Sequence, residues 1–91
     1  MSGALCRTAE ICNSRGLHAR AAAKFCKVAQ QFESEISVHR NGNDVAATSI
    51  MGLMMLSASQ GSTIEMRAKG PDAAAALDAL CELVANKFDE E

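Results

Sequence analysis

The sequence predicts an α+β fold in which helices cover one face of a four-stranded, mainly antiparallel sheet. Stretches of alternating apolar and polar residues, typical of strands, are interleaved with apolar residues at spacings of three and four, typical of helices. The length points the same way, because 91 residues suffice for one core and leave no room for a second. We therefore expect a single domain over residues 1–91, with its elements in the order βαββαβα.

A strand followed by a helix is expected in the first third of the chain. Residues 5–12 alternate roughly with a period of two, and residues 13–16 form a loop in this interpretation. From Ala19 onward, apolar residues three and four apart form one stripe along a helix that should end near Phe32. The stripe consists of Ala22, Phe25, Val28, Ala29 and Phe32.

Two strands joined by a tight turn are expected next. Apolar and polar residues alternate over 36–39, and a returning strand should cover about 44–47. Between them stands Asn41-Gly42, a dipeptide that accepts the positive φ angles of a two-residue hairpin turn.

A short helix is expected over residues 50–56, which are all apolar apart from Gly52. The hydroxyl of Thr48 or Ser49 stands where it can cap the first turn. Gly52 should weaken this helix, because glycine loses more backbone entropy than other residues when it becomes helical.

The last strand and helix are marked by alternation and by a helix-start signal. Thr63–Lys69 alternates again, and Gly70-Pro71-Asp72 supplies the proline and the acid typical of a helix beginning. The apolar stripe of the last helix is expected to consist of Ala73, Ala76, Leu77, Leu80, Leu83, Val84 and Phe88.

The charge and cysteine content exclude several classes of protein. Nine Lys and Arg against eleven Asp and Glu give a net charge of −2, so general attraction to nucleic acid or anionic lipid is not expected. The apolar stretch 50–56 is far shorter than the roughly 20 residues of a membrane-spanning helix. The cysteines show neither C-x-x-C nor zinc-finger spacing, so we predict reduced thiols in or near the core of a soluble, cytoplasmic protein without metal or cofactor. They are Cys6, Cys12, Cys26 and Cys81.

The segment Gly16-Leu17-His18-Ala19-Arg20 stands where the first loop becomes the first helix. A histidine there lies at or next to the N-cap, where unpaired backbone N–H groups and the positive end of the helix dipole can hold a phosphate. A neutral imidazole is nucleophilic and its phosphorus–nitrogen bond is easily transferred onward, whereas a serine ester would be stable. Arg20 could add a bidentate clamp on the phosphate oxygens. From position alone, however, a capping or surface histidine is the commoner explanation.

Resemblance to a known family favours the chemical interpretation. Residues 16–22, GLHARAA, closely resemble the active-centre segment of HPr, the histidine-containing phosphocarrier of the bacterial phosphoenolpyruvate-dependent phosphotransferase system. Residues 48–54, TSIMGLM, resemble the regulatory-site segment of that family at the matching separation. The resemblance covers nearly the whole chain, and the Ala-rich first helix and the Met-rich segment resemble those of alphaproteobacterial members. Family members often have Pro where this chain has Ala21, which makes the helix start less rigid and frees one amide.

The resemblance implies a phosphoryl carrier and not an enzyme. His18 would accept a phosphoryl group through Nδ1 from phosphorylated Enzyme I, with assistance from Arg20, and pass it to Enzyme IIA domains in sugar uptake, regulation or both. It also implies an HPr-like open-faced two-layer sandwich with three helices on one face. We expect this protein to act as a monomer.

The apolar residues of the short helix are expected to form a docking surface. A short helix buries about half its circumference, so some of its large side chains should stay exposed. The resemblance implies that Ile50, Met51 and Met54 dock partners beside His18. The alternative, in which all of these residues and Met55 belong to the core, stays open at this point.

Lys27 and Ser49 are candidate accessory residues. Lys27, and with less support Lys24, could form a basic rim facing acidic partners, although most such lysines are only solvated. Ser49 needs no role beyond helix capping. The resemblance implies that it is also a regulatory phosphoserine, modified by HPr kinase in bacteria that possess the kinase, and its phosphate would add about two negative charges to the docking surface.

Three rival functions remain to be separated. A regulatory carrier of the nitrogen-related branch, without a transport role, would have the same motifs. A non-catalytic protein-interaction module cannot be distinguished by composition. A nucleic-acid-binding domain is disfavoured, because such α+β domains stack bases on sheet aromatics and this chain has no Trp or Tyr.

Overall fold

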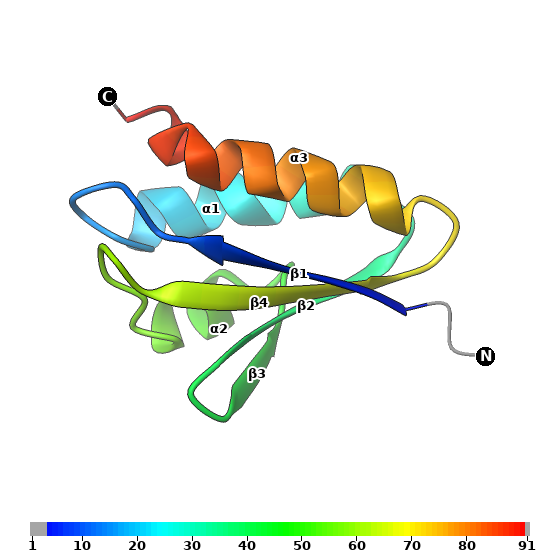
Figure 1. Cartoon of the computed structure of the whole chain (residues 1–91), viewed down its shortest axis with the longest axis horizontal. Coiled ribbons are helices and arrows are strands. Elements are labelled where there is room, and N and C mark those ends of the chain that lie inside the picture. The colour runs from blue at the N-terminus through cyan, green and yellow to red at the C-terminus, as the bar shows by residue number, and fades with distance from the viewer. Residues whose placement is uncertain (1–3, 91) are drawn as a thin grey trace.

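The structure, a computed structural model that describes residues 4–90, has the expected α+β architecture (Figure 1). Its four strands are β1 (Ala4–Glu10), β2 (Glu35–Arg40), β3 (Asn43–Ala46) and β4 (Thr63–Lys69). They form one antiparallel sheet in the order β1-β4-β2-β3. The helices are α1 (Ala19–Ala29), α2 (Ile50–Met55) and α3 (Ala73–Ala85), and a short 3-10 turn, η1 (Lys87–Asp89), follows α3.

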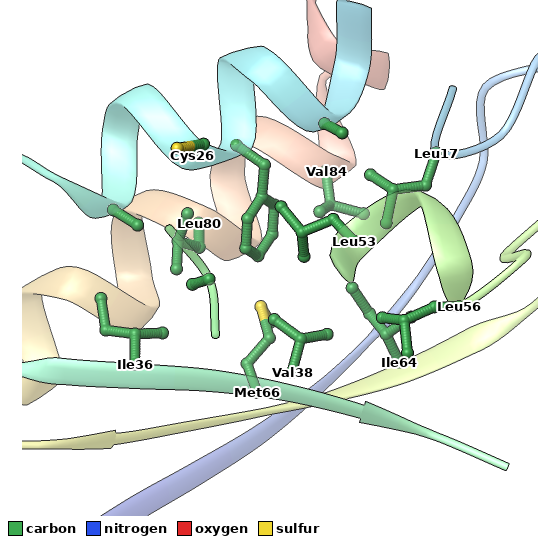
Figure 2. Packing of buried hydrophobic residues seen from close by; sticks show 14 of the residues in the cluster. Leu17, Cys26, Ile36, Val38, Leu53, Leu56, Ile64, Met66, Leu80 and Val84 are labelled. Carbon is green, nitrogen blue, oxygen red and sulfur yellow. The ribbon is translucent and has the colours of Figure 1, made fainter. Parts of the chain in front are cut away.

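The core lies between the helices and one face of the sheet. Alternate residues of β2 and β4 are buried, while their neighbours face the open side of the sheet. This alternation confirms the period of two that predicted these strands. Figure 2 shows the buried side chains converging from both layers, among them Ile36, Val38, Ile64, Met66, Leu53, Leu80 and Val84.

The predicted hairpin between β2 and β3 is confirmed. Asn41 and Gly42 have φ angles of 52° and 82°, the left-handed conformation for which this dipeptide is suited. The register pairs Arg40 with Asn43 across the turn. The returning strand begins at Asn43 and ends at Ala46, one residue earlier at each end than expected.

Helix α2 begins as predicted at a serine cap, with Ser49 Oγ accepting the Gly52 N–H at 3.0 Å. The structure also explains Gly52. A Cβ there would lie 3.0 Å from both Ser49 Oγ and the Val45 side chain. Glycine therefore lowers the intrinsic stability of the helix but allows α2 to pack closely against β3.

The ends of β1 and α1 fall two and three residues earlier than expected, respectively. β1 ends at Glu10 and not at Cys12, and α1 ends at Ala29 and not at Phe32. Phe32 still packs against the core, from the turn that follows the helix.

Asp72 was expected to mark the start of the last helix, and it holds the N-cap position of α3 without capping that helix through its side chain. Its carboxylate instead accepts the backbone N–H groups of Glu33 and Ser34 and the Ser34 hydroxyl, at 2.6 to 3.0 Å. The Ser34 hydroxyl, together with these amides, holds the pKa of Asp72 below its ordinary range. The carboxylate therefore ties the segment after α1 to the start of α3.

The predicted helical stripe was wrong at its last member. α3 ends at Ala85, and Lys87, Phe88 and Asp89 all have positive φ, between 55° and 62°. Such a run is rare for residues with a side chain. It turns Phe88 fully into the core, and the Phe88 carbonyl accepts a hydrogen bond from Lys24 Nζ at 2.8 Å. The end of the chain thus returns to the start of α1, as Figure 1 shows.

The four cysteines are free thiols, as expected, but they are not all in or near the core. Cys26 is buried and Cys12 and Cys81 are half-buried, whereas Cys6 is exposed. β1 is an edge strand, and Cys6 lies on the open face of the sheet, where its thiol contacts Glu65 at 3.0 Å. Within residues 4–90, the helices are too short or too polar to cross a membrane.

Candidate functional site

The site begins with a loop that is fixed against the segment after α2. Gly16 has a φ of 67°, and a Cβ there would lie 2.6 Å from the Ala58 carbonyl oxygen. The next residue, Leu17, is buried and donates its backbone N–H to that same oxygen at 2.8 Å. Only glycine satisfies both the left-handed backbone and the close approach, so Gly16 determines where α1 starts.

His18 is the N-cap of α1, as the sequence predicted. Its backbone is extended, with φ −79° and ψ −178°, and its carbonyl accepts the first helical hydrogen bond from the Ala22 N–H at 2.8 Å. Nδ1 accepts the Arg20 backbone N–H at 3.3 Å. One ring nitrogen therefore faces the amides at the positive end of the helix, while the side chain is 25% exposed.

The other ring nitrogen faces Glu90, which the sequence did not suggest. His18 Nε2 contacts Glu90 Oε2, and Glu90 Oε1 accepts a hydrogen bond from Asn13 Nδ2 at 3.0 Å. Asn13 is fully buried and also donates to the Gly16 carbonyl at 2.8 Å. Hydrogen bonds from His18 and then Asn13 hold the pKa of the Glu90 carboxyl below its ordinary range, against the opposing effect of burial.

This arrangement selects one tautomer of the neutral imidazole. A neutral ring has one N–H donor and one acceptor nitrogen. Nδ1 accepts a backbone amide and Nε2 faces a carboxylate, so the proton belongs on Nε2 and the lone pair on Nδ1. A carboxylate partner on one ring nitrogen orients the ring and leaves the lone pair on the other nitrogen.

A polar pocket of about 430 Å³ opens beside this pair. Three basic side chains line it, and Arg20 is the only one of them that the sequence had placed in the site. Lys24 was a weaker candidate for a basic rim facing acidic partners, with simple solvation as the alternative, and its ammonium group is bound to the Phe88 carbonyl. The lining consists of Ser14, Arg15, Arg20, Lys24, Asp89 and Glu90.

The α2 side chains divide into a buried and an exposed set. Leu53 is fully buried and Leu56 nearly so, and both belong to the core. The interpretation in which all the large residues of this helix are core is therefore wrong. The exposed set consists of Ile50 at 40%, Met51 at 73%, Met54 at 41% and Met55 at 73%, and we call these four residues the α2 apolar patch.

The direction of α2 decides which candidate residues lie near His18. Leu17 bonds to Ala58, just beyond the end of α2, so that end lies beside the histidine. At the other end, the Cys26 thiol donates to the Thr48 carbonyl at 3.3 Å, next to Ser49. Lys27 and Ser49 therefore share the far end of the patch. Lys27 is nine residues along α1 from His18, about 13 Å at the helical rise per residue.

Sequence reasoning missed Asn13, Arg15 and Glu90. Asn13 and Arg15 lie within the predicted loop, but no local pattern distinguishes them from ordinary loop residues. Glu90 is 72 positions from His18, so only the folded chain brings them together. In the described part of the chain, no group of three or more His, Cys, Asp or Glu side chains could hold a metal ion.

Comparison with known proteins gives consistent matches over nearly the full length. A family model described as "PTS HPr component phosphorylation site" matches residues 5–86. The phosphocarrier protein HPr of Cupriavidus necator is 50% identical, with 92% of this chain and 94% of that protein covered. The phosphocarrier protein NPr of Shewanella violacea is 49% identical, with 92% of each covered. A crystal structure of HPr-C-His from Thermoanaerobacter tengcongensis superposes with a TM-score of 0.91 at 45% identity, covering 96% and 98% of the two chains.

Replacing Glu90 with Gln should weaken the preference of the His18 ring for the tautomer with its proton on Nε2. The amide lacks the negative charge that favours a proton on Nε2, and it can turn its own N–H toward the ring. Nitrogen-15 NMR of the His18 ring should show a nearly pure Nε2–H tautomer in the wild type and a mixed population in Glu90→Gln. Glu82→Gln, the same change on the exposed side of α3, is the control.

The pH dependence of the contact follows from the direction of the Glu90 pKa. Folding lowers the Glu90 pKa from its ordinary value of 4.5. The stabilisation of the fold by the His18–Glu90 contact is therefore fully present above pH 4.5 and is lost as the pH falls through the lower pKa of the folded state. Identical ring signals in the wild type and Glu90→Gln at every pH would show that Glu90 does not orient His18.

Proposed function

Because the chain belongs to the HPr family of phosphotransferase-system phosphocarriers, we propose that His18 is the residue that carries the phosphoryl group. The observation that supports this proposal is the position of Nδ1 at the start of α1, 3.3 Å from the Arg20 backbone N–H. A phosphoryl group on Nδ1 lies against amides that have no helical carbonyl partner, where its negative charge is stabilised. A carrier needs no further chemistry of its own.

The transfer step uses both nitrogens of the ring. The Nδ1 lone pair attacks phosphorus on phosphorylated Enzyme I, and the bond from phosphorus to the donor breaks as the new one forms. Nε2 keeps its proton and Glu90 keeps the ring in place, so the phosphorylated imidazole returns to a neutral group when an Enzyme IIA domain accepts the phosphoryl group. His39 does not stand at a helix start. It lies within β2, and its Nδ1 is 3.4 Å from Asp44 Oδ1.

Arg20 and its neighbours supply the positive charge that the transferred group requires. In the free carrier the pocket already contains an anion, the Glu90 carboxylate, next to Arg15 and Arg20. The guanidinium group of Arg20 can turn toward a phosphoryl group at the helix start without movement of the backbone. We assign it the clamping role.

The α2 apolar patch is the proposed docking surface for Enzyme I and Enzyme IIA domains. Ile50, Met51 and Met54 are its assigned contact residues, and its exposure supports this assignment. The patch ends at Met55, three residues before Ala58, whose carbonyl binds the loop that carries His18. Lys27 is a charged contact at the opposite end, beside Ser49.

Ser49 is the proposed regulatory phosphorylation site, for HPr kinase/phosphorylase where the cell contains that enzyme. Its hydroxyl is half-exposed and lies at the end of the patch away from His18. A phosphate on Ser49 weakens docking of the partner and does not contact the phosphoryl group on His18. The protein is proposed to act as a cytoplasmic monomer. HPr and NPr are matched at nearly equal identity, so the accepting Enzyme IIA domain decides between the sugar and nitrogen branches.

His18→Ala should abolish labelling of the protein by phosphoenolpyruvate and Enzyme I while leaving the fold intact, because a cap side chain contributes about 1 kcal/mol. The measurement is intact mass before and after incubation, together with loss of the label in acid and its retention in base. His39→Ala is the matched control and should be labelled like the wild type. An acid-labile phosphate on His18→Ala would contradict the assignment.

Arg20→Ala should slow transfer from Enzyme I by at least about tenfold, because one charge-assisted hydrogen bond is lost where charge moves in the transition state. Arg20→Lys should restore only part of the rate, since an ammonium group cannot form the bidentate contact. Rapid-quench transfer rates for the three proteins provide the test. Equal rates in Arg20→Ala and the wild type would show that the helix amides suffice.

Ser49→Asp should raise the Michaelis constant for phosphorylation by Enzyme I and leave the turnover number nearly unchanged. A new anion in an apolar interface is costly to desolvate, while at a helix start it is favourable by roughly 0.3 to 1 kcal/mol, so the melting temperature should hold or rise slightly. Ser49→Asn caps the helix without charge and is the control. If both variants bind Enzyme I like the wild type, Ser49 is a helix cap only.

A further inference from the structure

The methionines within residues 4–90 are distributed unevenly between core and surface. Met66 is fully buried under the helices, whereas Met51 and Met55 are 73% exposed and Met54 is 41% exposed. The three exposed thioethers lie on one six-residue helix, within five consecutive positions. The sulfur atoms therefore meet solvent without any opening of the fold.

The chemistry of a thioether gives this cluster a property that leucine or isoleucine would lack. The sulfur lone pair attacks one oxygen of hydrogen peroxide, the O–O bond breaks, and the departing hydroxide takes up the remaining proton, so the products are a sulfoxide and water. The sulfoxide is a strong hydrogen-bond acceptor. Burying it in an apolar interface without a donor carries the cost of an unsatisfied polar group.

We propose that Met51, Met54 and Met55 form a peroxide-sensitive modification site, where oxidation to the sulfoxide weakens docking of the carrier to its phosphotransfer partners. The inference rests on the proposed docking function of the α2 apolar patch. Because methionine sulfoxide is reduced enzymatically, the effect is reversible. His18 and its hydrogen bonds lie outside the modified group. Oxidation therefore weakens binding to the partner and leaves the rate of the transfer step unchanged.

The position of α2 separates this effect from unfolding. Leu53 and Leu56 anchor the helix in the core, and Ser49 caps it. The exposed thioethers occupy the opposite side, so three added oxygens lie in solvent in the free carrier. The fold is stable to the modification and only the surface that meets a partner changes.

The thiols compete poorly for peroxide below neutral pH. The thiolate is the reactive form of cysteine, and Glu65 raises the pKa of the exposed Cys6 thiol. Cys26 is buried. Dilute hydrogen peroxide at about pH 5 therefore favours oxidation of the exposed thioethers over oxidation of the thiols.

The test treats the full-length carrier alone with hydrogen peroxide at that pH, removes the oxidant, and locates each added oxygen by peptide mass. Met51 and Met55 should convert first and Met54 more slowly, with Met66 unmodified in the folded protein. With untreated Enzyme I, the Michaelis constant for the oxidised carrier should rise at least fivefold while the turnover number stays within twofold. Methionine sulfoxide reductase with a dithiol should restore the original value.

A variant with Met51→Leu, Met54→Leu and Met55→Leu is the control, and each sample is compared with its own untreated portion. Its Michaelis constant should be the same before and after peroxide, whatever its starting value. An unchanged constant for the oxidised wild type, or an equal rise in the leucine variant, would overturn the inference. Failure of untreated wild type to accept a phosphoryl group would instead overturn the proposed function.

Discussion

The hydrogen bond from the Leu17 amide to the Ala58 carbonyl is the contact on which the rest of the site depends. It joins the loop before α1 to the segment after α2, and it is possible only because Gly16 has no side chain to strike the same carbonyl. One contact therefore joins the start of α1, which puts Nδ1 of His18 against the helix amides, to the segment that follows α2 and its exposed methionines. The proposed reacting atom and the proposed docking surface therefore share one anchor.

The second constraint comes from the end of the chain. Burial of Phe88 stabilises a backbone turn that its residues rarely adopt, and the turn delivers Glu90 to Nε2 of His18. Asn13 holds the carboxylate from the other side. The histidine is thus oriented through both nitrogens, by a local hydrogen bond within α1 and by a contact that spans nearly the whole sequence.

Local sequence patterns predicted the strands, turns and helix starts that depend on residues close together in the sequence. Alternation located β4 to the residue, Asn41-Gly42 predicted the hairpin, and the position of His18 at a helix start followed from the loop before it. What the sequence could not show depends on distant contacts. Asp72 stands at the start of α3 as expected, but its carboxylate binds the segment after α1. Phe88 was expected within that helix and instead enters the core from a turn. Glu90 could not be linked to His18, because nothing near either residue signals the other.

The central claim is that the start of α1 presents Nδ1 of His18, with the proton on Nε2, as the site of phosphorylation. The most direct measurement is phosphorus–nitrogen correlation NMR on the nitrogen-15-labelled protein after phosphorylation by phosphoenolpyruvate and Enzyme I. We expect one phosphorus per chain, coupled to Nδ1 of His18, with the ring proton retained on Nε2. Coupling to Nε2 of His18, or to either nitrogen of His39, would contradict it.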